Sequence, residues 1–289
     1  MPIKAAWQTK HSEKRVQCEL CPHNCLLSVG QVGLCKVRKN SDGELVSTVF
    51  GLPVALHLDP IEKKPLFHFH PGSKVLSLGT VGCNFSCQFC QNSEISQLSS
   101  DEVNPPFHSP ESVIESARRV NADGIAFTYN EPTVFYEYML AIAKLAKKSE
   151  LKTVLVSNGY INEAPLKELA HYIDAANIDV KAFSDDFYRK IAGGTLSPVL
   201  QSLKLLKRMG VHIEVTNLII PELNDSPEEL KQLFEWIAEH LGKDTPLHLS
   251  RFFPRYKMVD VAVTPIETLE MAQKVAKESG LEWVYLGNV

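Results

Sequence analysis

The chain has 289 residues, and its composition excludes several classes of protein. Hydrophobic residues make up 44% and charged residues 22%, which is typical of a folded globular protein and not of a disordered one. The 30 Lys and Arg residues are outnumbered by 34 Asp and Glu residues, so a nucleic-acid-coating protein is not expected. No apolar run approaches the ~18 residues of a membrane helix, and the first twenty residues hold no stretch of signal-peptide length. We therefore expect a cytoplasmic protein with no membrane partner.

Residues 1–72 and 73–289 differ in pattern, and we expect a domain boundary between them. The first 40 residues are polar and rich in turn-forming residues, and residues 44–58 predict two short strands broken near 51–53. From residue 73, apolar runs of strand length alternate with segments of helical period. The predicted strands are 74–79, 124–129, 152–157, 174–180, 211–220, 246–250 and 282–286, and the predicted helices are 110–121, 133–149, 162–172, 196–209, 226–241 and 265–279.

Repeated strand–helix units imply parallel strands joined by right-handed crossovers. Seven strands are one short of a closed eight-stranded barrel. We therefore predict an α/β fold, a partial TIM-like barrel of about six to seven parallel strands with a small Cys-rich N-terminal extension. An open doubly wound sheet is the alternative. Three helices begin with a capping residue followed by Pro, at 109–110, 226–227 and 264–265.

The seven cysteines fall into two groups, Cys18, Cys21, Cys25 and Cys35, and Cys83, Cys87 and Cys90. Disulfide scaffolds are short, secreted and even-numbered in cysteine, and this chain fits none of these conditions. The first group supplies four thiolates, which suits either a structural zinc ion or an iron–sulfur cluster. The second group follows the first predicted barrel strand. Its three thiolates would hold three irons of a cuboidal cluster and leave the fourth open, whereas a zinc site with a distant fourth ligand is the simpler alternative.

Polar residues also follow the next predicted strands, and parallel barrels carry their chemistry at this edge. The second strand is followed by Asn130 and Glu131, the third ends in Ser157 and is followed by Asn158, and the fourth carries Asp179 and Lys181. Each could be a cap, a turn residue or an internal ion pair, but together they predict one functional rim.

The loop Cys83-x3-Cys87-x-Phe89-Cys90 resembles the signature of radical S-adenosylmethionine (SAM) enzymes, and the rim residues follow in that family's order. Asp179-x-Lys181 is similar to a pair in the branch of pyruvate formate-lyase activating enzyme. Residues 59–69 and 250–256 resemble the radical SAM member of the AmmeMemoRadiSam system. The two glycines that usually precede the glutamate are replaced by Tyr129 and Asn130.

The resemblance implies a 4Fe–4S cluster at Cys83, Cys87 and Cys90 and SAM as the second cofactor. It places the methionine amino group at Asn130 and Glu131, the ribose at Ser157 and Asn158, and SAM also beside Asp179 and Lys181. The implied activity is that of an oxidoreductase. The cluster cleaves SAM reductively to methionine and a 5′-deoxyadenosyl radical, which takes hydrogen from a protein or small-molecule substrate. A reducing partner such as flavodoxin or ferredoxin is implied as well. The alternative class is a non-catalytic iron–sulfur electron carrier or a zinc-binding interaction module.

Two further segments have open interpretations. Alternation in Phe67–His70 would place both histidines on one face of a strand, either as metal ligands or as solvent-facing polar residues. Arg251 and Arg255 follow the sixth strand and would either clamp an anionic substrate or lie in a solvated loop.

Overall fold

The computed structural model describes residues 2–289 and confirms the predicted α/β class. Seven parallel strands lie side by side in chain order, and the sheet does not close on itself. The strands are β8 (Lys74–Gly79), β9 (Gly124–Phe127), β10 (Lys152–Ser157), β11 (Ala175–Asp179), β12 (His212–Ile219), β13 (Leu247–Arg251) and β14 (Val284–Gly287). This is a partial barrel, as the strand–helix rhythm predicts.

Strand β7 (Ala55–Pro60) extends this sheet in a way that was not predicted. It pairs antiparallel with β8, from Ala55 opposite Gly79 to Pro60 opposite Lys74. The two short strands expected within 44–58 are present as β6 (Glu44–Ser47) and β7. Only β7 joins the barrel, because β6 pairs within the N-terminal segment.

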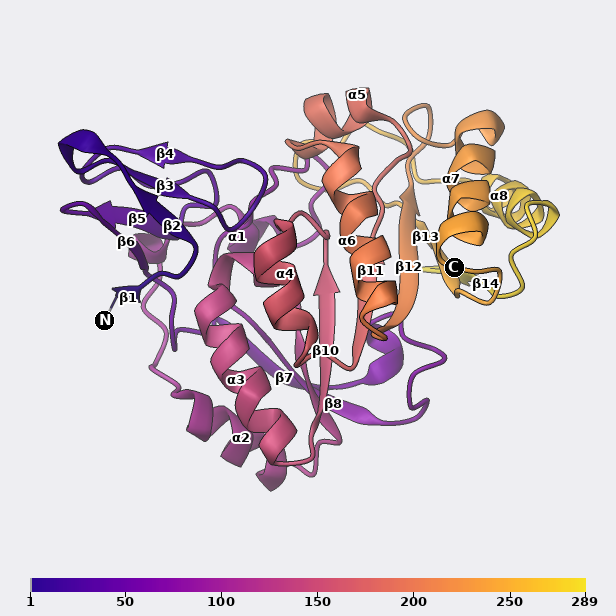
Figure 1. Cartoon of the computed structure of the whole chain (residues 1–289). Coiled ribbons are helices and arrows are strands. Elements are labelled where there is room, and N and C mark those ends of the chain that lie inside the picture. The colour runs from indigo at the N-terminus through magenta and orange to yellow at the C-terminus, as the bar shows by residue number, and fades with distance from the viewer. Residues whose placement is uncertain (1) are drawn as a thin grey trace.

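The six predicted helices are present within a few residues of their expected ends, and Figure 1 shows α3, α4, α6 and α7 along the outer face of the sheet. Their bounds are α2 (Pro110–Arg119), α3 (Tyr136–Lys148), α4 (Glu163–Ala170), α6 (Leu196–Arg208), α7 (Pro227–His240) and α8 (Ile266–Glu278). Short helical segments are α1 (Ser93–Ser96), α5 (Asp185–Phe187), η1 (Ser12–Lys14), η2 (Ile61–Lys63), η3 (Ser100–Glu102), η4 (Pro132–Phe135) and a π-helix, η5 (Tyr188–Ala192). No helix within residues 2–289 has the length and apolar character needed to cross a membrane.

The predicted helix caps are confirmed at two of the three positions. The Ser109 and Ser226 hydroxyls accept hydrogen bonds from backbone N–H groups in the first turns of α2 and α7. At α8 the prediction is wrong, because Pro265 is the capping residue. Thr264 instead donates to the Ile219 carbonyl at 2.6 Å and thereby ties the end of β12 to the chain before α8.

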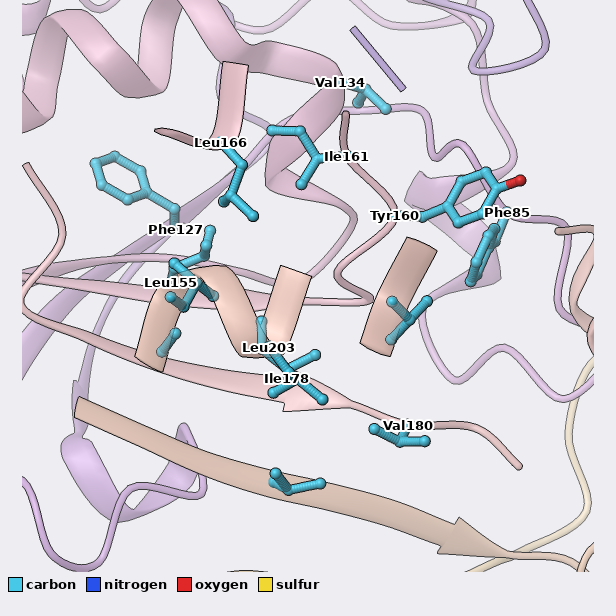
Figure 2. Packing of buried hydrophobic residues seen from close by; sticks show 14 of the residues in the cluster. Phe85, Phe127, Val134, Leu155, Tyr160, Ile161, Leu166, Ile178, Val180 and Leu203 are labelled. Atoms are coloured by element: carbon cyan, nitrogen blue, oxygen red, sulfur yellow. The ribbon is translucent and has the colours of Figure 1, made fainter. Parts of the chain in front are cut away.

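Apolar side chains form two buried clusters, and the larger of the two packs the strands of the sheet against the outer helices. Figure 2 shows Phe127 of β9, Leu155 of β10 and Ile178 of β11 with side chains from α4 and α6. All of these are nearly or fully buried. Burying one such side chain contributes about 1.5–3 kcal/mol, so this layer fixes the strands whose ends carry the rim residues.

The N-terminal segment forms two small antiparallel sheets beside the barrel, as Figure 1 shows. One contains β1 (Ile3–Lys4), β6 and β5 (Arg38–Ser41), and the other contains β2 (Gln8–Lys10), β3 (Val16–Cys18) and β4 (Leu26–Leu27). The buried Arg38 side chain holds the segment to α3 by donating to Glu137 at 2.9 Å. Residue 1 of the predicted 1–72 segment lies outside the described residues.

Residues 67–70 do not form the strand that their alternation indicated. The backbone N–H groups of Phe67 and His68 donate to the buried Glu214 carboxylate of β12, at 3.0 and 2.8 Å. Asn177 of β11 donates to the Pro65 carbonyl at 2.8 Å. The backbone of residues 65–68 therefore hydrogen-bonds to side chains of the sheet and does not pair with a neighbouring strand. The local sequence pattern does not reveal these bonds.

Candidate cofactor site

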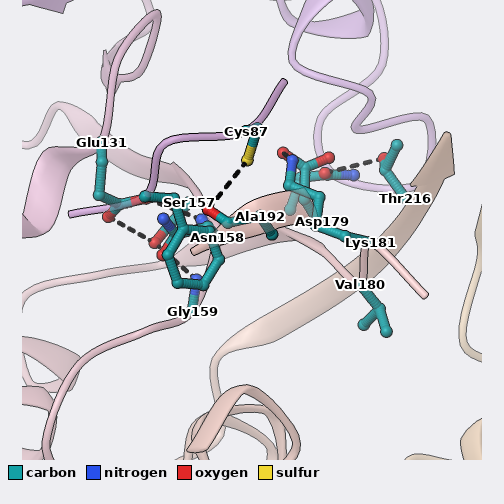
Figure 3. A network of polar contacts seen from close by, with 12 residues as sticks. Cys87, Glu131, Ser157, Asn158, Gly159, Asp179, Val180, Lys181, Ala192 and Thr216 are labelled. Carbon is teal, nitrogen blue, oxygen red and sulfur yellow. Dashed lines mark hydrogen bonds and ion pairs between the residues drawn. The ribbon is translucent and has the colours of Figure 1, made fainter. Parts of the chain in front are cut away.

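A cavity of about 470 Å³ brings together every residue predicted for the larger site. Its walls come from the loops that follow β8, β9 and β10 and from the strands β11 to β13. Figure 3 shows part of this polar wall from close by. The predicted residues that line the cavity are Cys83, Cys87, Cys90, Asn130, Glu131, Ser157, Asn158, Asp179 and Lys181.

The three-cysteine loop is held from behind by residues 191–194. Backbone N–H groups of Ser86 and Gln88 donate to the carbonyls of Ala192 and Ile191, at 2.8 and 3.1 Å. Gly194 lies so close to the loop that a β-carbon there would overlap the Phe85 ring. The loop therefore has a fixed backbone path before any cofactor binds.

The π-helix η5 leads directly into this support, and the sequence analysis missed it. π-helical turns are rare and often lie at functional sites. The adjacent glycines, Gly193 and Gly194, are the signal that could have found it, because glycines permit close backbone approach. Tyr188 in the same turn is buried, and its hydroxyl accepts from the backbone N–H of Lys181 at 3.0 Å.

Of the three thiols of the loop, Cys87 is buried, and Cys83 and Cys90 are half-buried. Burial raises the pKa of the Cys87 thiol to about 12, although the nearby Lys181 ammonium opposes this. Burial also raises the pKa of Cys83, and the Glu131 carboxylate adds to the effect. Thiolates are the usual ligands of iron–sulfur clusters, so three of them on one roomy cavity fit such a group. The fit rests on this donor chemistry, because no three Cys, His, Asp or Glu side chains within residues 2–289 are already grouped tightly enough to hold a metal ion.

Glu131 is the centre of a buried network that joins the ends of β9 and β10, drawn in Figure 3. Its Oε1 accepts from Thr133 N at 2.9 Å, Thr133 Oγ1 at 2.7 Å and Ser157 Oγ at 2.8 Å. Its Oε2 accepts from the Asn158 backbone N–H at 2.8 Å. Burial raises the pKa of Glu131 although these donors oppose the shift. A carboxylate oxygen accepts more than one hydrogen bond, so Oε2 can take a further donor from the cavity.

The side chains of Asn130 and Asn158 are also bonded to neighbouring loops. Asn130 Nδ2 donates to the Gly82 carbonyl at 2.8 Å, next to Cys83. Asn158 Nδ2 donates to Asn84 Oδ1 at 2.9 Å, on the other side of Cys83. Both asparagines therefore position the cysteine loop as well as line the cavity.

Asp179, the last residue of β11, and Lys181, two residues beyond it, form an ion pair. Lys181 Nζ donates to Asp179 Oδ2 at 2.7 Å. Burial alone would lower the pKa of Lys181, but Asp179 and the Cys87 thiol outweigh it and raise that pKa. Asp179 therefore keeps Lys181 protonated beside Cys87.

A second charged group at the cavity lies in residues 59–69, the segment that resembles the AmmeMemoRadiSam member. Lys64 Nζ donates to Asp59 Oδ2 at 2.8 Å, and the Tyr129 hydroxyl donates to the same oxygen at 2.7 Å. All three residues line the cavity, so residues 59–64 are both an ion-paired turn and part of its wall. Arg251 and Arg255 are not among the lining residues, and they bond to Thr264 and Glu94 instead.

The N-terminal cysteines Cys18, Cys21, Cys25 and Cys35 line a separate, small cavity of about 20 Å³. Burial raises the pKa of Cys21, and the other three thiols each raise it further. Burial likewise raises the pKa of Cys35 to about 11, despite the nearby Arg38 guanidinium. The four predicted ligands therefore lie near one another.

Comparison with known proteins identifies the family of the chain. The model of the radical SAM superfamily matches residues 77–237, which is more than half of the chain. The chain belongs to the radical SAM superfamily. Membership implies a 4Fe–4S cluster and SAM as cofactors, and it confirms the family predicted from the cysteine loop and the rim residues.

Three proteins show how far the similarity extends. An uncharacterized protein of Methanocaldococcus jannaschii, MJ0808, is 46% identical over 99% of this chain and 85% of its own. The pyruvate formate-lyase-activating enzyme of Clostridium pasteurianum is 24% identical over 53% of this chain and 64% of its own. The crystal structure of Streptococcus suis SuiB bound to the precursor peptide SuiA has a TM-score of 0.58 and 10% identity, covering 79% of this chain and 51% of that one. At that identity, the SuiB structure establishes the fold alone.

Proposed function

We propose that this protein is a radical SAM enzyme that takes a hydrogen atom from a substrate bound at the rim of the barrel. The observation that carries the proposal is the single cavity of about 470 Å³ lined by three cysteines and all six predicted SAM-binding residues. A cavity of this size suits a drug-sized ligand. A simple electron carrier needs no such space, which favours the enzyme over that alternative.

Each group of residues has a distinct role in this proposal. Cys83, Cys87 and Cys90 hold the 4Fe–4S cluster, which when reduced supplies the electron that cleaves SAM to methionine and a 5′-deoxyadenosyl radical. Glu131 Oε2 accepts a hydrogen bond from the SAM amino group. Phe85 and Phe89 line the cavity and exclude water from it.

The rest of the rim orients SAM. Ser157 and Asn158 face the ribose, and Asn130 holds the cysteine loop against the end of β9. Asp179 holds the Lys181 ammonium at the cavity wall near Cys87, where this ammonium opposes part of the negative charge of a thiolate-bound cluster.

A polypeptide is the proposed substrate class. The support is the Clostridium pasteurianum relative, which is named as the activating enzyme of another protein. The four N-terminal cysteines are proposed as a second metal centre, of zinc or of iron and sulfur. A flavodoxin or ferredoxin donor and a cytoplasmic location stay predictions.

Anaerobic turnover tests the proposal. The protein is reconstituted with iron and sulfide, reduced with dithionite and incubated with SAM and protein extract from cells grown on Cα-deuterated glycine. The proposal expects 5′-deoxyadenosine, with deuterium in it if a polypeptide glycine is the donor. Absence of 5′-deoxyadenosine from protein with a full cluster would overturn the enzymatic role, and unlabelled product would exclude only a polypeptide glycine as the hydrogen donor.

A further inference from the structure

We infer that Cys18, Cys21, Cys25 and Cys35 hold a single zinc ion, and that this zinc centre braces the loop carrying Cys83. The inference rests on the proposed second metal centre and gives it an identity and a task. It stands on the size of the cysteine cavity, on an unpartnered buried donor in its wall, and on the contacts between the two cysteine segments.

The size of the cysteine cavity favours a zinc ion over an iron–sulfur cluster. About 20 Å³ is little more than the space that one water-sized probe occupies. A 4Fe–4S cube contains eight atoms and needs several times that space. One zinc ion needs only the space between four sulfurs, which have to draw in to about 2.3 Å from it because no three such side chains within residues 2–289 already lie at metal-binding distance. The cavity proposed for the cluster and SAM has about 470 Å³. Zinc is therefore the better occupant of the smaller site.

Arg38 provides a buried, unpartnered donor in the wall of this site. Its side chain lines the cysteine cavity and is almost fully buried. Its Nη1 and Nη2 are bonded to Glu137 and the Ala6 carbonyl. Within residues 2–289, its Nε has no hydrogen-bond partner. Buried polar groups are almost always paired, so the free N–H calls for an acceptor such as a thiolate.

The charge balance fits the same assignment. Zinc binding converts four thiols to thiolates, releases four protons, and leaves a centre with two negative charges and no change of oxidation state. Metal-bound thiolates are stabilised by nearby hydrogen-bond donors. The guanidinium of Arg38 provides both a positive charge and the free N–H.

Two contacts join this centre to the Cys83 loop. A β-carbon on Gly82 would lie 2.5 Å from the Cys35 carbonyl oxygen, so the backbones of the two segments touch at residues 35 and 82. His23, between Cys21 and Cys25, donates from Nε2 to the Asn84 carbonyl at 2.7 Å. The chain is therefore held on both sides of Cys83 by residues of the four-cysteine segment.

Asn84 connects the four-cysteine segment to the residues that are proposed to bind SAM. Its buried side chain donates to the Tyr160 carbonyl at 2.7 Å and accepts from Asn158 Nδ2 at 2.9 Å. A shift of the His23 segment would thus move Asn84 together with Cys83 and Asn158. Zinc binding fixes Cys21 and Cys25, and with them His23.

Metal analysis tests the identity of the ion. The triple variant Cys83→Ala/Cys87→Ala/Cys90→Ala, produced with both iron and zinc supplied, should hold one zinc and no iron per chain. Cobalt in place of zinc should give the visible spectrum of tetrahedral thiolate coordination. Wild-type protein measured in parallel should hold one zinc beside about four irons, which keeps the test valid if the triple variant folds poorly. Two clusters without zinc, or no metal in the folded triple variant, would overturn the assignment.

The bracing role is tested by SAM affinity at constant zinc content. His23→Phe keeps the ring beside Tyr160 but removes the donor to Asn84, and should weaken SAM binding about tenfold while zinc stays at one per chain. His11→Phe is the control, because the His11 side chain is exposed and its ring bonds to Gln17, away from both cysteine segments. Equal SAM affinity in both variants would overturn the brace.

A glycine pair gives an independent second test. Gly82 and Gly30 have similar left-handed φ values of 88° and 83°, so alanine strains both backbones alike. Only at Gly82 does the methyl group meet another segment. Gly82→Ala should weaken SAM binding at least tenfold and leave zinc in place, whereas Gly30→Ala should do neither. Wild-type protein that lacks iron but keeps zinc would contradict the proposed function and leave the zinc assignment standing.

Discussion

Tyr129 and Asp59 are joined by a hydrogen bond of 2.7 Å, in which the phenol donates to Asp59 Oδ2. Tyr129 stands where the resembled family motif carries glycine, and its φ of 72° lies in the region that favours glycine. The Lys64 ammonium adds a contact 4.7 Å from the centre of the tyrosine ring. The left-handed backbone conformation at residue 129 is therefore retained without glycine, and the contacts of the Tyr129 side chain with Asp59 and Lys64 stabilise it.

Removing this hydroxyl should destabilise the protein and loosen the turn before Glu131. Tyr129→Phe leaves a buried ion pair with one donor fewer, so we expect a loss of about 1–3 kcal/mol in the free energy of unfolding. Urea unfolding measures it. Tyr285→Phe is the control, since that hydroxyl bonds to the exposed His68. An equal loss in both variants would contradict a special role for the Tyr129–Asp59 bond.

Glu131→Gln tests the proposed contact with the SAM amino group. A charge-assisted hydrogen bond is worth about 1.5–3 kcal/mol, so SAM affinity should weaken roughly 10- to 100-fold. Cluster content should not change, because the carboxylate does not bind iron in this proposal. Titration of SAM into the reduced protein, followed by the paramagnetic signal of the cluster, reports both quantities.

Thr133→Val is the matched control for Glu131. It removes one of the three donors to Oε1 and keeps the carboxylate charge and the side-chain shape. If Glu131 contacts SAM, this variant should bind SAM within about threefold of wild type. A loss as large as that of Glu131→Gln would assign Glu131 to positioning of the loops and not to SAM contact.

Glu214 predicts a pH dependence of stability. Burial would raise its pKa, but His212, His248 and the N–H groups of Phe67 and His68 outweigh burial and hold it at about 2, below its ordinary 4.5. Because the folded-state pKa is lowered, the stabilisation is complete above pH 4.5 and is lost as the pH falls toward 2. The shift corresponds to about 3 kcal/mol.

Comparison of wild type with Glu214→Gln isolates this effect from other carboxylates. The variant should be less stable at pH 7, and the difference between the two proteins should shrink steadily between pH 4.5 and 2. Urea unfolding at a series of pH values measures it. A difference that stays constant through that range would contradict the lowered pKa.

The barrel could be predicted because its signals are local. Each strand–helix unit shows its own apolar run and helical period, as 152–157 and 162–172 do. Polar residues that follow parallel strands must meet at one edge, and this placed Glu131, Ser157 and Lys181 on one cavity before any contact was known.

Features that depend on distant partners were missed. The antiparallel pairing of β7 with β8, and the bonds from Glu214 to residues 67 and 68, join segments whose own sequences do not indicate each other. The alternation of residues 67–70 predicted a strand, and that prediction was wrong. The support of the cysteine loop by residues 191–194 is equally long-range, and its one sign in the sequence is the pair Gly193 and Gly194.

Gly194→Ala tests that support. The backbone of Gly194 does not have a left-handed φ, but a β-carbon there would overlap the Phe85 ring. We expect displacement of the cysteine loop and a loss of at least half of the bound iron after reconstitution. Gly287→Ala is the control, because its φ is not left-handed either and the atom nearest to the added methyl group lies at an ordinary 3.7 Å. Full iron content in Gly194→Ala would contradict the supporting role.

The central claim is that Cys83, Cys87 and Cys90 carry the cluster that drives SAM cleavage. The most direct measurement is the yield of 5′-deoxyadenosine from dithionite-reduced, anaerobically reconstituted protein, with wild type beside the Cys83→Ala/Cys87→Ala/Cys90→Ala variant. The account predicts product from wild type and none from the variant, whose circular dichroism stays that of a folded protein. Product from the triple variant, or none from wild type with a complete cluster, would contradict it.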